Sequence, residues 1–378
     1  MAQPAVLANV DGHVDRHASS VVGQRDTPSV AVKPDGEASV KKETCVIGMS
    51  SVRSRMESEG FSKTATNFIM SSWRSSTKGA YDVFIRKWEL FADKIKVDKV
   101  SPTVKDAVNF LAQLVEEGFS YSAIATARSA LSSFLKLDNT DKSFGQQEIV
   151  KRFMKGLFEE NPTLPRYVCT WDVNIVLEFL KSWSPVDKLT LKELTLKLCM
   201  LLALVTGQRC QTLHLLNTEH MVVYNTKCIF YIMSLIKHSR RGSHQEPIEI
   251  DAYPKCTELC VVTVLKEYLR RTEMFRKNAG SQLFLTLVSP HSPASKDTVS
   301  RWIKTTLSLA GIELNYSAHS TRMAATSAAD KCGVPIETIM KAAGWTNSST
   351  FGKFYRKNVE KTSMGQSLLD NFLEHPKK

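Results

Sequence analysis

The residues best suited to chemistry in this 378-residue sequence lie in the stretch Tyr316–Tyr355. It opens with a His-x-x-Arg pair, His319 and Arg322. A helical spacing of three places both side chains on one face of a helix. An imidazole beside a guanidinium makes a site for an anionic oxygen, such as that of a phosphate. The hydroxyl of Tyr355, at the end of the stretch, would be a nucleophile if it were brought to that phosphate.

A second guanidinium is offered by Arg209, in the segment TGQRCQTLHLL. It stands just beyond the apolar run Leu189–Thr206, which is expected to be a helix that ends at Gly207. An arginine at a turn between two apolar helices is rarely an ordinary surface residue, although it can also cap the neighbouring helix. Two guanidiniums on one phosphorus would stabilise the negative charge that a phosphodiester transition state gathers on its equatorial oxygens, without a metal.

The elements that must position these residues fall into two groups, and the first is a compact helical domain at residues 61–163. Tyr81, Phe84, Trp88 and Phe91 recur at helical spacing and are interpreted as core. Lysines and arginines on the polar faces could follow a phosphate backbone or could simply be solvated. The expected helices are Thr64–Trp73, Ser76–Asp93, a third from Ser101-Pro102 to Gly118, Ser120–Lys136 with Ser120 as its cap, and Gln146–Glu159.

The second group, residues 164–378, is expected to mix helices with a short antiparallel sheet. β-Branched and aromatic residues alternate in Val222–Tyr224 and Cys228–Ile236. Residues 247–250 are expected to form the strand that pairs with them, after the loop KHSRRGSH, which holds Lys237. Such a charged loop is usually only solvated, but this one falls between two candidate phosphate sites. The expected helices are Thr170–Trp183 capped by Thr170, Leu189–Thr206, Thr257–Lys277, Lys296–Gly311, a buried helix around Met323–Ala329, one that Gly344 ends just before Trp345, and an amphipathic one at Ser363–Leu373.

These elements predict a mainly α-helical protein with a small antiparallel β-sheet, an α+β fold, preceded by a disordered tail over residues 1–60. The tail holds 7 lysines and arginines against 8 acidic residues, so the net charge of +12 comes from the remainder of the chain. Basic globular domains commonly bind polyanions, although a generally basic soluble protein is the alternative interpretation.

The composition argues against several classes of protein. Eight cysteines without a CxxC pair and nine scattered histidines predict reduced thiols in a cytosolic or nuclear protein, and no zinc or other metal site. No apolar run approaches the roughly 18 residues that span a bilayer, so no membrane contact is expected. Neither GxxxxGKS/T nor GxGxxG occurs, so no nucleotide or other cofactor is expected.

Taken in chain order, the candidate residues resemble the pattern R…K…HxxR…W…Y of the tyrosine recombinases, the family of phage integrases and Xer-type resolvases. The local sequences TGQRCQTL, HSTR and AGWTNSSTFGKFY are most similar to those of the recombinases of DIRS-type and Ngaro-type retrotransposons and of crypton elements. Each motif alone is a weak signal, whereas the ordered set is a strong one, and the resemblance covers residues 62–360. The residues of the set are Arg209, Lys237, His319, Arg322, Trp345 and Tyr355.

The resemblance implies a role for each residue in this set. Arg209 and Arg322 would clamp the two non-bridging oxygens of the scissile phosphate, and His319 and Trp345 would hydrogen-bond the same phosphate. Tyr355 would attack phosphorus and leave a 3′-phosphotyrosyl bond with a free 5′-hydroxyl. A free tyrosine has a pKa of about 10, so it needs a cationic site to attack near neutral pH.

The resemblance assigns Lys237 as donor of a proton to the departing 5′-oxygen, a role that the neighbouring His238 and Arg240 could share. Many members of the family carry an acidic residue at the place of Thr212, three positions after the first arginine. Tyr316 is the other tyrosine near the His-x-x-Arg pair and remains an alternative nucleophile, although its place before the pair fits the motif order badly.

The resemblance also implies a partner, a location and an assembly. The two domains would close around double-stranded DNA, and a homo-tetramer would act on two duplexes in the nucleus to integrate a mobile element. One alternative is a domesticated DNA-binding regulator that keeps the fold without strand exchange. Another is a type IB topoisomerase, which uses similar chemistry to relax supercoils. A lost nucleophile or arginine would favour the regulator, and neither is lost.

Overall fold

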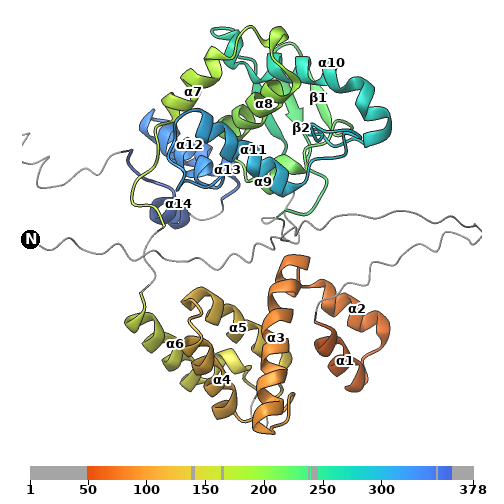
Figure 1. Ribbon diagram of the computed structural model, residues 1–378, viewed down its shortest axis with the longest axis vertical. Helices are drawn as coiled ribbons and strands as arrows, with labels where there is room; N and C mark the ends of the chain where they lie inside the picture. The colour runs from red at the N-terminus through yellow and green to blue at the C-terminus, as the bar shows by residue number, and fades with distance from the viewer. Residues whose placement is uncertain are drawn as a thin grey trace, which may run out of the picture. The chain divides into compact units, whose positions relative to one another are not determined.

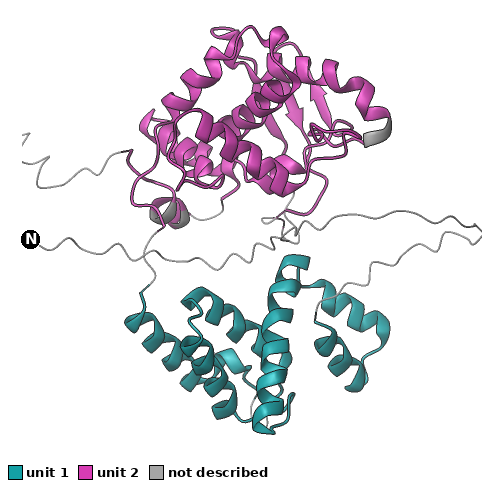
Figure 2. Ribbon diagram, in the orientation of Figure 1, with its two compact units in different colours: residues 1–164 teal, residues 165–378 magenta. Residues whose placement is uncertain are grey.

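The computed structural model of the protein describes residues 49–137, 141–162, 166–236, 239, 246–345 and 348–359. The expected tail up to residue 48, Lys237 with most of its loop, and the expected helix Ser363–Leu373 all lie outside these residues. The chain divides into two compact units, residues 1–164 and 165–378 (Figure 2). The expected boundary was between residues 163 and 164.

The first unit is built of helices (Figure 1), and several aromatic side chains are buried in its core. Trp88 is fully buried, donates a hydrogen bond from its indole nitrogen to the carbonyl of Lys99 at 2.8 Å, and packs on Phe110 with ring centroids 5.5 Å apart. Phe84 is buried in the same cluster, which confirms the interpretation of the aromatic stripe as core. The elements are α1 (Ser50–Ser58), α2 (Lys63–Ser71), α3 (Ser75–Ile95), α4 (Val104–Glu116), α5 (Tyr121–Phe134), the 3-10 turn η1 (Phe144–Gln146) and α6 (Glu148–Glu160).

The first helix corrects the extent of the expected tail. Residues 50–58 form α1, so the prediction of a disordered tail over residues 1–60 is wrong for its last part. Met49, Val52 and Met56 are buried in the core of the unit, and the backbone N–H of Met49 donates to the Asp82 carboxylate at 2.8 Å. Nine residues make a marginal helix in water, so packing against α2 and α5 must stabilise it.

Helix α8 (Leu191–Thr206) is the centre of the second unit. It is apolar on nearly every side and therefore buried along most of its length. It contacts α10 (Val261–Ala279), α11 (Lys296–Leu309) and α12 (Ser320–Lys331). A capping box between Thr190 and Glu193 begins the helix, and Gly207, at φ 57°, ends it as the sequence predicts.

The remaining helices of this unit are shorter. Asp172 caps α7 by accepting from the backbone N–H of Asn174, so the prediction of Thr170 as the cap is wrong. Both residue types cap helices well, and Thr170 is instead buried with its backbone N–H bonded to the Asn358 carbonyl at 2.9 Å. These elements are α7 (Val173–Ser182), η2 (Val186–Lys188), α9 (Cys210–His214), η3 (Thr257–Leu259), α13 (Ile336–Ala343) and α14 (Ser348–Phe354).

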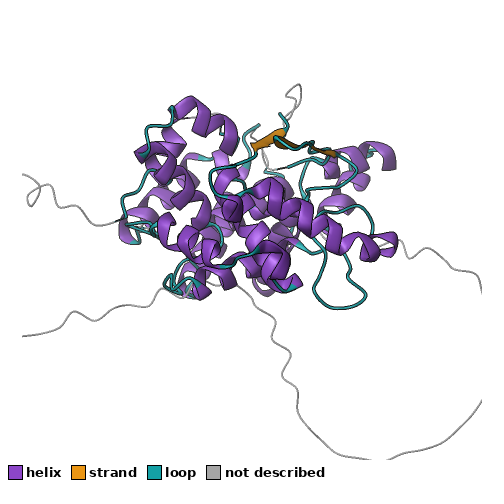
Figure 3. Cartoon of the chain, turned by 90° about the horizontal axis from the view of Figure 1, so that it is seen from above, coloured by secondary structure: helices purple, strands orange, loops and turns teal. Residues whose placement is uncertain are grey.

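A small antiparallel sheet, orange in Figure 3, completes the described part of the unit. It has three strands in the order β1-β2-β3. Its strands are β1 (Met221–Val223), β2 (Lys227–Phe230) and β3 (Ile248–Asp251). Ile229 lies opposite Val222 on one side and Glu249 on the other. The second strand was expected to reach Ile236 but ends at Phe230. The mainly α fold with a small antiparallel sheet is confirmed.

Within the described part of the chain, no helix combines the length and the apolar character needed to cross a membrane.

Candidate active site

Arg322 is the buried centre of the candidate site. It lies on α12, is 1% exposed, and donates hydrogen bonds from its two terminal nitrogens to the carbonyls of Gly207 and Ala343, both at 2.6 Å. These carbonyls stand at the ends of α8 and α13, where a helix leaves backbone acceptors without intrahelical partners. The guanidinium therefore ties the ends of two helices together as well as carrying a charge.

Burial of the Arg322 guanidinium disfavours its charged form. Burial and, to a smaller extent, the nearby charge of Arg209 lower the pKa of Arg322 to about 9, although the hydroxyl of Tyr355 acts in the opposite direction. The group is still protonated near neutral pH. A guanidinium whose proton affinity is lowered by a second guanidinium marks a place where an anion would be stabilised.

Arg209 reaches the same place from a different element. It is the residue directly before α9 and follows Gly207, which ends α8. Burial lowers the pKa of Arg209, while the Tyr355 hydroxyl opposes this effect through its charge and a hydrogen bond. The turn that Gly207 allows by adopting φ 57° thus directs Arg209 toward the tyrosine.

Tyr355 follows α14 and lies among the other candidate residues. Its hydroxyl is 3.0 Å from Nε2 of His319, the residue that begins α12. Its ring centroid lies 4.5 Å from that of Trp345, and the Arg322 guanidinium carbon lies 5.5 Å from the Tyr355 ring. Two arginines, a histidine and a tryptophan therefore surround one phenol, although Arg209 is 146 positions away from Tyr355 in the sequence.

Two buried N–H donors of the site have no hydrogen-bond partner among the described residues. One is Nε1–H of Trp345, which is 7% exposed, and the other is Nε–H of Arg322. Buried donors are nearly always satisfied, because leaving one unpaired is costly. Their presence beside Tyr355 fits a site that accepts oxygen atoms from a ligand.

The alternative nucleophile, Tyr316, is engaged elsewhere. Its ring stacks on Tyr167 with centroids 5.2 Å apart, and its hydroxyl donates to the Cys169 carbonyl at 3.5 Å. Burial raises the pKa of Tyr316, which disfavours the phenolate. The geometry thus favours Tyr355 over Tyr316.

The structure brings together five of the six predicted site residues: Arg209, His319, Arg322, Trp345 and Tyr355. The sixth, Lys237, lies outside the described residues together with His238 and Arg240. Ile236 and Ser239 flank Lys237 and His238. The backbone N–H of Ile236 donates a hydrogen bond to the Ser239 hydroxyl at 2.9 Å. The position of Lys237 therefore stays a prediction.

Sequence reasoning missed Gln208, which supports the site from between Gly207 and Arg209. It is buried, and its side-chain amide donates to the Ala342 carbonyl at 2.6 Å, next to the Ala343 carbonyl that Arg322 holds. A glutamine within an otherwise apolar segment, directly before the arginine, was the available signal. Thr212, at the place where many tyrosine recombinases carry an acidic residue, is buried in α9.

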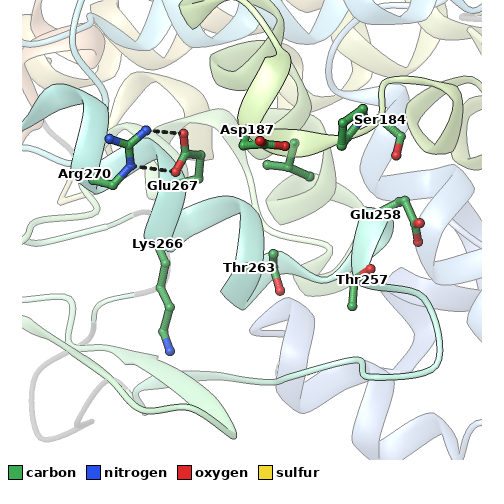
Figure 4. A pocket seen from close by; sticks show the side chains of 10 residues that line it. Ser184, Asp187, Thr257, Glu258, Thr263, Lys266, Glu267 and Arg270 are labelled. Atoms are coloured by element: carbon green, nitrogen blue, oxygen red, sulfur yellow. Dashed lines mark hydrogen bonds and ion pairs between the residues drawn. The ribbon is translucent and has the colours of Figure 1, made fainter.

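A separate pocket of 450 Å³ lies between η2, η3 and α10, and no predicted site residue lines it. Figure 4 shows Glu267 and Arg270 paired with each other on its wall, with Lys266, Asp187 and Glu258 also around it. Among the described residues, no group of three or more histidine, cysteine or acidic side chains could hold a metal ion.

Solved structures with a similar fold are DNA recombinases. The XerH site-specific recombinase bound to palindromic difH substrate in a post-cleavage complex has a TM-score of 0.53 and 16% identity, covering 79% of this chain and 79% of that chain. The Tn1549 transposon integrase in complex with transposon right end DNA has a TM-score of 0.50 and 14% identity, covering 86% of this chain and 98% of that chain. No curated protein sequence matches the chain.

At these identities the likeness to solved structures concerns the fold. Residues 175–361 match the phage integrase family, and they include all six predicted site residues. Within the second unit, residues 175–361 are thus similar to the phage integrase family, and the unit has the fold of the tyrosine recombinase catalytic domains.

Proposed function

We propose that the protein is a DNA tyrosine recombinase that cuts and rejoins strands through a 3′-phosphotyrosyl intermediate. The observation that supports this most is the position of the Tyr355 hydroxyl, 3.0 Å from His319 and in electrostatic contact with both Arg209 and Arg322. A regulator that only binds DNA has no need of a phenol placed among these groups.

The reaction follows from the chemistry of the groups. The Tyr355 oxygen forms a bond to phosphorus, its proton leaves to the adjacent His319 or to solvent, and the bond from phosphorus to the 5′-oxygen breaks. The two arginines and the free N–H of Trp345 stabilise the charge on the non-bridging oxygens. Lys237 would protonate the departing 5′-oxygen. The phosphotyrosyl bond retains the bond energy, so the reverse attack by a 5′-hydroxyl needs no ATP.

The binding partner in this proposal is double-stranded DNA. Residues 61–378 carry a net charge of +13, and such a basic surface favours binding to the phosphate backbone. The structurally similar XerH recombinase is bound to its difH substrate, and the Tn1549 integrase is in complex with transposon right end DNA. Action as a homo-tetramer on two duplexes, integration of a mobile element, and a nuclear location rest on the resemblance of the sequence motifs alone.

The experiment is covalent capture of DNA. The protein is mixed with nicked duplexes whose sequence around the nick is randomised. Cleavage just before the nick releases a short fragment and traps the adduct on the protein, which is then purified under denaturing conditions. Wild-type protein is expected to capture DNA of a recoverable sequence, Tyr355→Phe to capture none, and the matched control Tyr316→Phe to capture it as the wild type does.

The same experiment separates the alternatives. A domesticated regulator would bind the duplexes without covalent capture, and that result would contradict the proposal. A type IB topoisomerase would form the adduct but would relax supercoiled plasmid without joining two duplexes. Strand exchange between two duplexes that carry the recovered sequence, without plasmid relaxation on unrelated DNA, is the outcome expected here.

A further inference from the structure

Ser327 holds the backbone at two points just beside Tyr355. It lies on α12 and is 3% exposed. Its hydroxyl donates a hydrogen bond to the carbonyl of Tyr355 at 2.5 Å and accepts one from the backbone N–H of Lys357 at 3.0 Å. One buried side chain therefore satisfies the backbone on both sides of Arg356.

Other contacts hold this end of the segment weakly. Helix α14 has only seven residues, too few to be stable in water by itself. Arg356 forms an ion pair with Asp330 at 2.7 Å, but its side chain is 64% exposed, and exposed pairs contribute little. Phe351 is buried in a cluster with Trp345 and anchors α14 one turn before the tyrosine. The backbone of this end is bonded by Ser327 at Tyr355 and Lys357 and, farther from the tyrosine, by the N–H of Thr170 at Asn358.

The position of Ser327 on α12 matters because the same helix carries Arg322, and His319 begins it. Five positions separate Arg322 from Ser327, all within one continuous helix. Two of the residues that would bind the phosphate, His319 and Arg322, therefore share one element with the residue that bonds the nucleophile's backbone. Movement of α12 would carry His319, Arg322 and the bond to the nucleophile's backbone together.

We propose that Ser327 is a positioning residue, which sets the place of the Tyr355 hydroxyl relative to the phosphate held by Arg209, His319 and Arg322. This inference rests on the proposed function. A nucleophile must lie within a narrow range of distance and angle to attack in line, and misplacement by about 1 Å can slow a reaction by about a hundredfold. Loss of Ser327 is therefore expected to slow the attack rather than to weaken DNA binding.

The test measures adduct formation in a single turnover, on the nicked duplex recovered by covalent capture. For Ser327→Ala, the rate at saturating DNA is expected to fall by about ten- to a hundredfold, with the half-saturating DNA concentration unchanged. Ser327→Thr keeps the hydroxyl and is expected to recover most of the rate. Ser327→Cys, a weaker hydrogen-bonding group of similar size, gives the same comparison if the alanine variant does not fold.

Ser320→Ala is the matched control. Ser320 is also a buried serine of α12, at 2% exposed, but its hydroxyl accepts from the Trp171 indole at 3.0 Å and donates to the Ser317 carbonyl at 2.7 Å. Thermal unfolding of both variants measures the general effect of losing a buried hydroxyl from this helix. The inference is supported if both unfold at similar temperatures and only the Ser327 variant slows the attack.

Two outcomes would overturn the inference. One is a wild-type rate of attack for Ser327→Ala at saturating DNA. The other is an equal slowing by the Ser327 and Ser320 variants, which would show a structural role only. Failure of the wild-type protein to form any adduct would instead count against the proposed function, and it would be seen before any variant is compared.

Discussion

The guanidinium of Arg322 lies against the indole of Trp345, with its central carbon 4.1 Å from the ring centroid. The contact is a cation–π interaction in a nearly dry site, since the two residues are 1% and 7% exposed. The indole thereby covers the charge of Arg322 while its own N–H has no partner among the described residues. Trp345 thus has two separable roles, as a cover and as a hydrogen-bond donor.

Substitution of Trp345 separates these roles. Trp345→Phe keeps an aromatic face over Arg322 and removes only the N–H, so the rate of adduct formation is expected to fall by up to about a hundredfold with little change in stability. Trp345→Ala also removes the buried ring and is expected to lower the free energy of unfolding by about 3–5 kcal/mol. Single-turnover kinetics and urea unfolding measure the two effects. A wild-type rate for the phenylalanine variant would show that the indole N–H does not contact the phosphate.

The two arginines are expected to differ in their effect on stability. Arg322→Lys cannot bond both the Gly207 and Ala343 carbonyls, so buried acceptors lose their partners and the free energy of unfolding is expected to fall by about 2–4 kcal/mol. Arg209→Lys changes a side chain that is only half-buried, so stability is expected to change less. Both variants are expected to slow adduct formation by about a hundredfold or more. Equal losses of stability in urea unfolding would argue against the structural role assigned to Arg322.

A side chain at Gly207 is expected to destabilise the protein. The φ of this glycine, 57°, is unfavourable for other residues, and an added Cβ would lie 3.2 Å from the Thr326 methyl carbon. Gly207→Ala is therefore expected to lower the free energy of unfolding by about 1–2 kcal/mol and to slow adduct formation, because the turn places both Arg209 and a carbonyl bound by Arg322. Gly333→Ala is the control, since Gly333 also has a positive φ, of 78°, but no atom lies within 4 Å of an added Cβ. If both variants slow the attack equally, the turn at Gly207 has no special role.

Lys197 on α8 predicts an unusual pH dependence of stability. The residue is fully buried, with its ammonium donating to the Trp183 carbonyl, and burial lowers the pKa of Lys197 from 10.5 to about 8. Between these values the unfolded chain binds more protons than the folded one, so stability is expected to rise as the pH increases from 8 to 10.5. Below pH 8 the cost of the buried charge is fully present.

The measurement is the free energy of unfolding in urea at several pH values. Lys197→Met removes the titrating group. As the pH rises above 8, the free energy of unfolding of the wild type is therefore expected to increase relative to that of the variant. Lys192→Met, on the same helix but not buried, is the control and should leave the pH dependence as it is in the wild type. A difference that does not change with pH would contradict the depressed pKa of Lys197.

The sequence predicted the helical fold, the small sheet and the residues of the site. It did not predict the contacts that hold those residues in place. His319 and Arg322 were visible from their spacing, and the end of α8 from Gly207, because these signals are local. The bonds from Arg322 to carbonyls 115 and 21 positions away depend on the packing of three helices, which no local pattern encodes. Ser327 was missed for the same reason, as one serine in a run of small residues.

Two errors in the fold have local causes. Thr170 and Asp172 are both good helix caps two positions apart, so propensity alone could not select Asp172. Helix α1 carries few apolar residues, and burial of Val52 and Met56 against other helices determines its fold. In both places tertiary packing decided between alternatives that the sequence left nearly equal.

The most direct test of the account is to find which residue carries the DNA after covalent capture. Digestion with trypsin, which cuts after lysine and arginine, places Tyr355 in the peptide Phe354–Arg356 and Tyr316 in the peptide Thr305–Arg322. Mass spectrometry of nuclease-treated adduct is predicted to find the nucleotide remnant on Tyr355, joined through a 3′-phosphate. A remnant on Tyr316 or any other residue, or a 5′-phosphate linkage, would contradict the central claim.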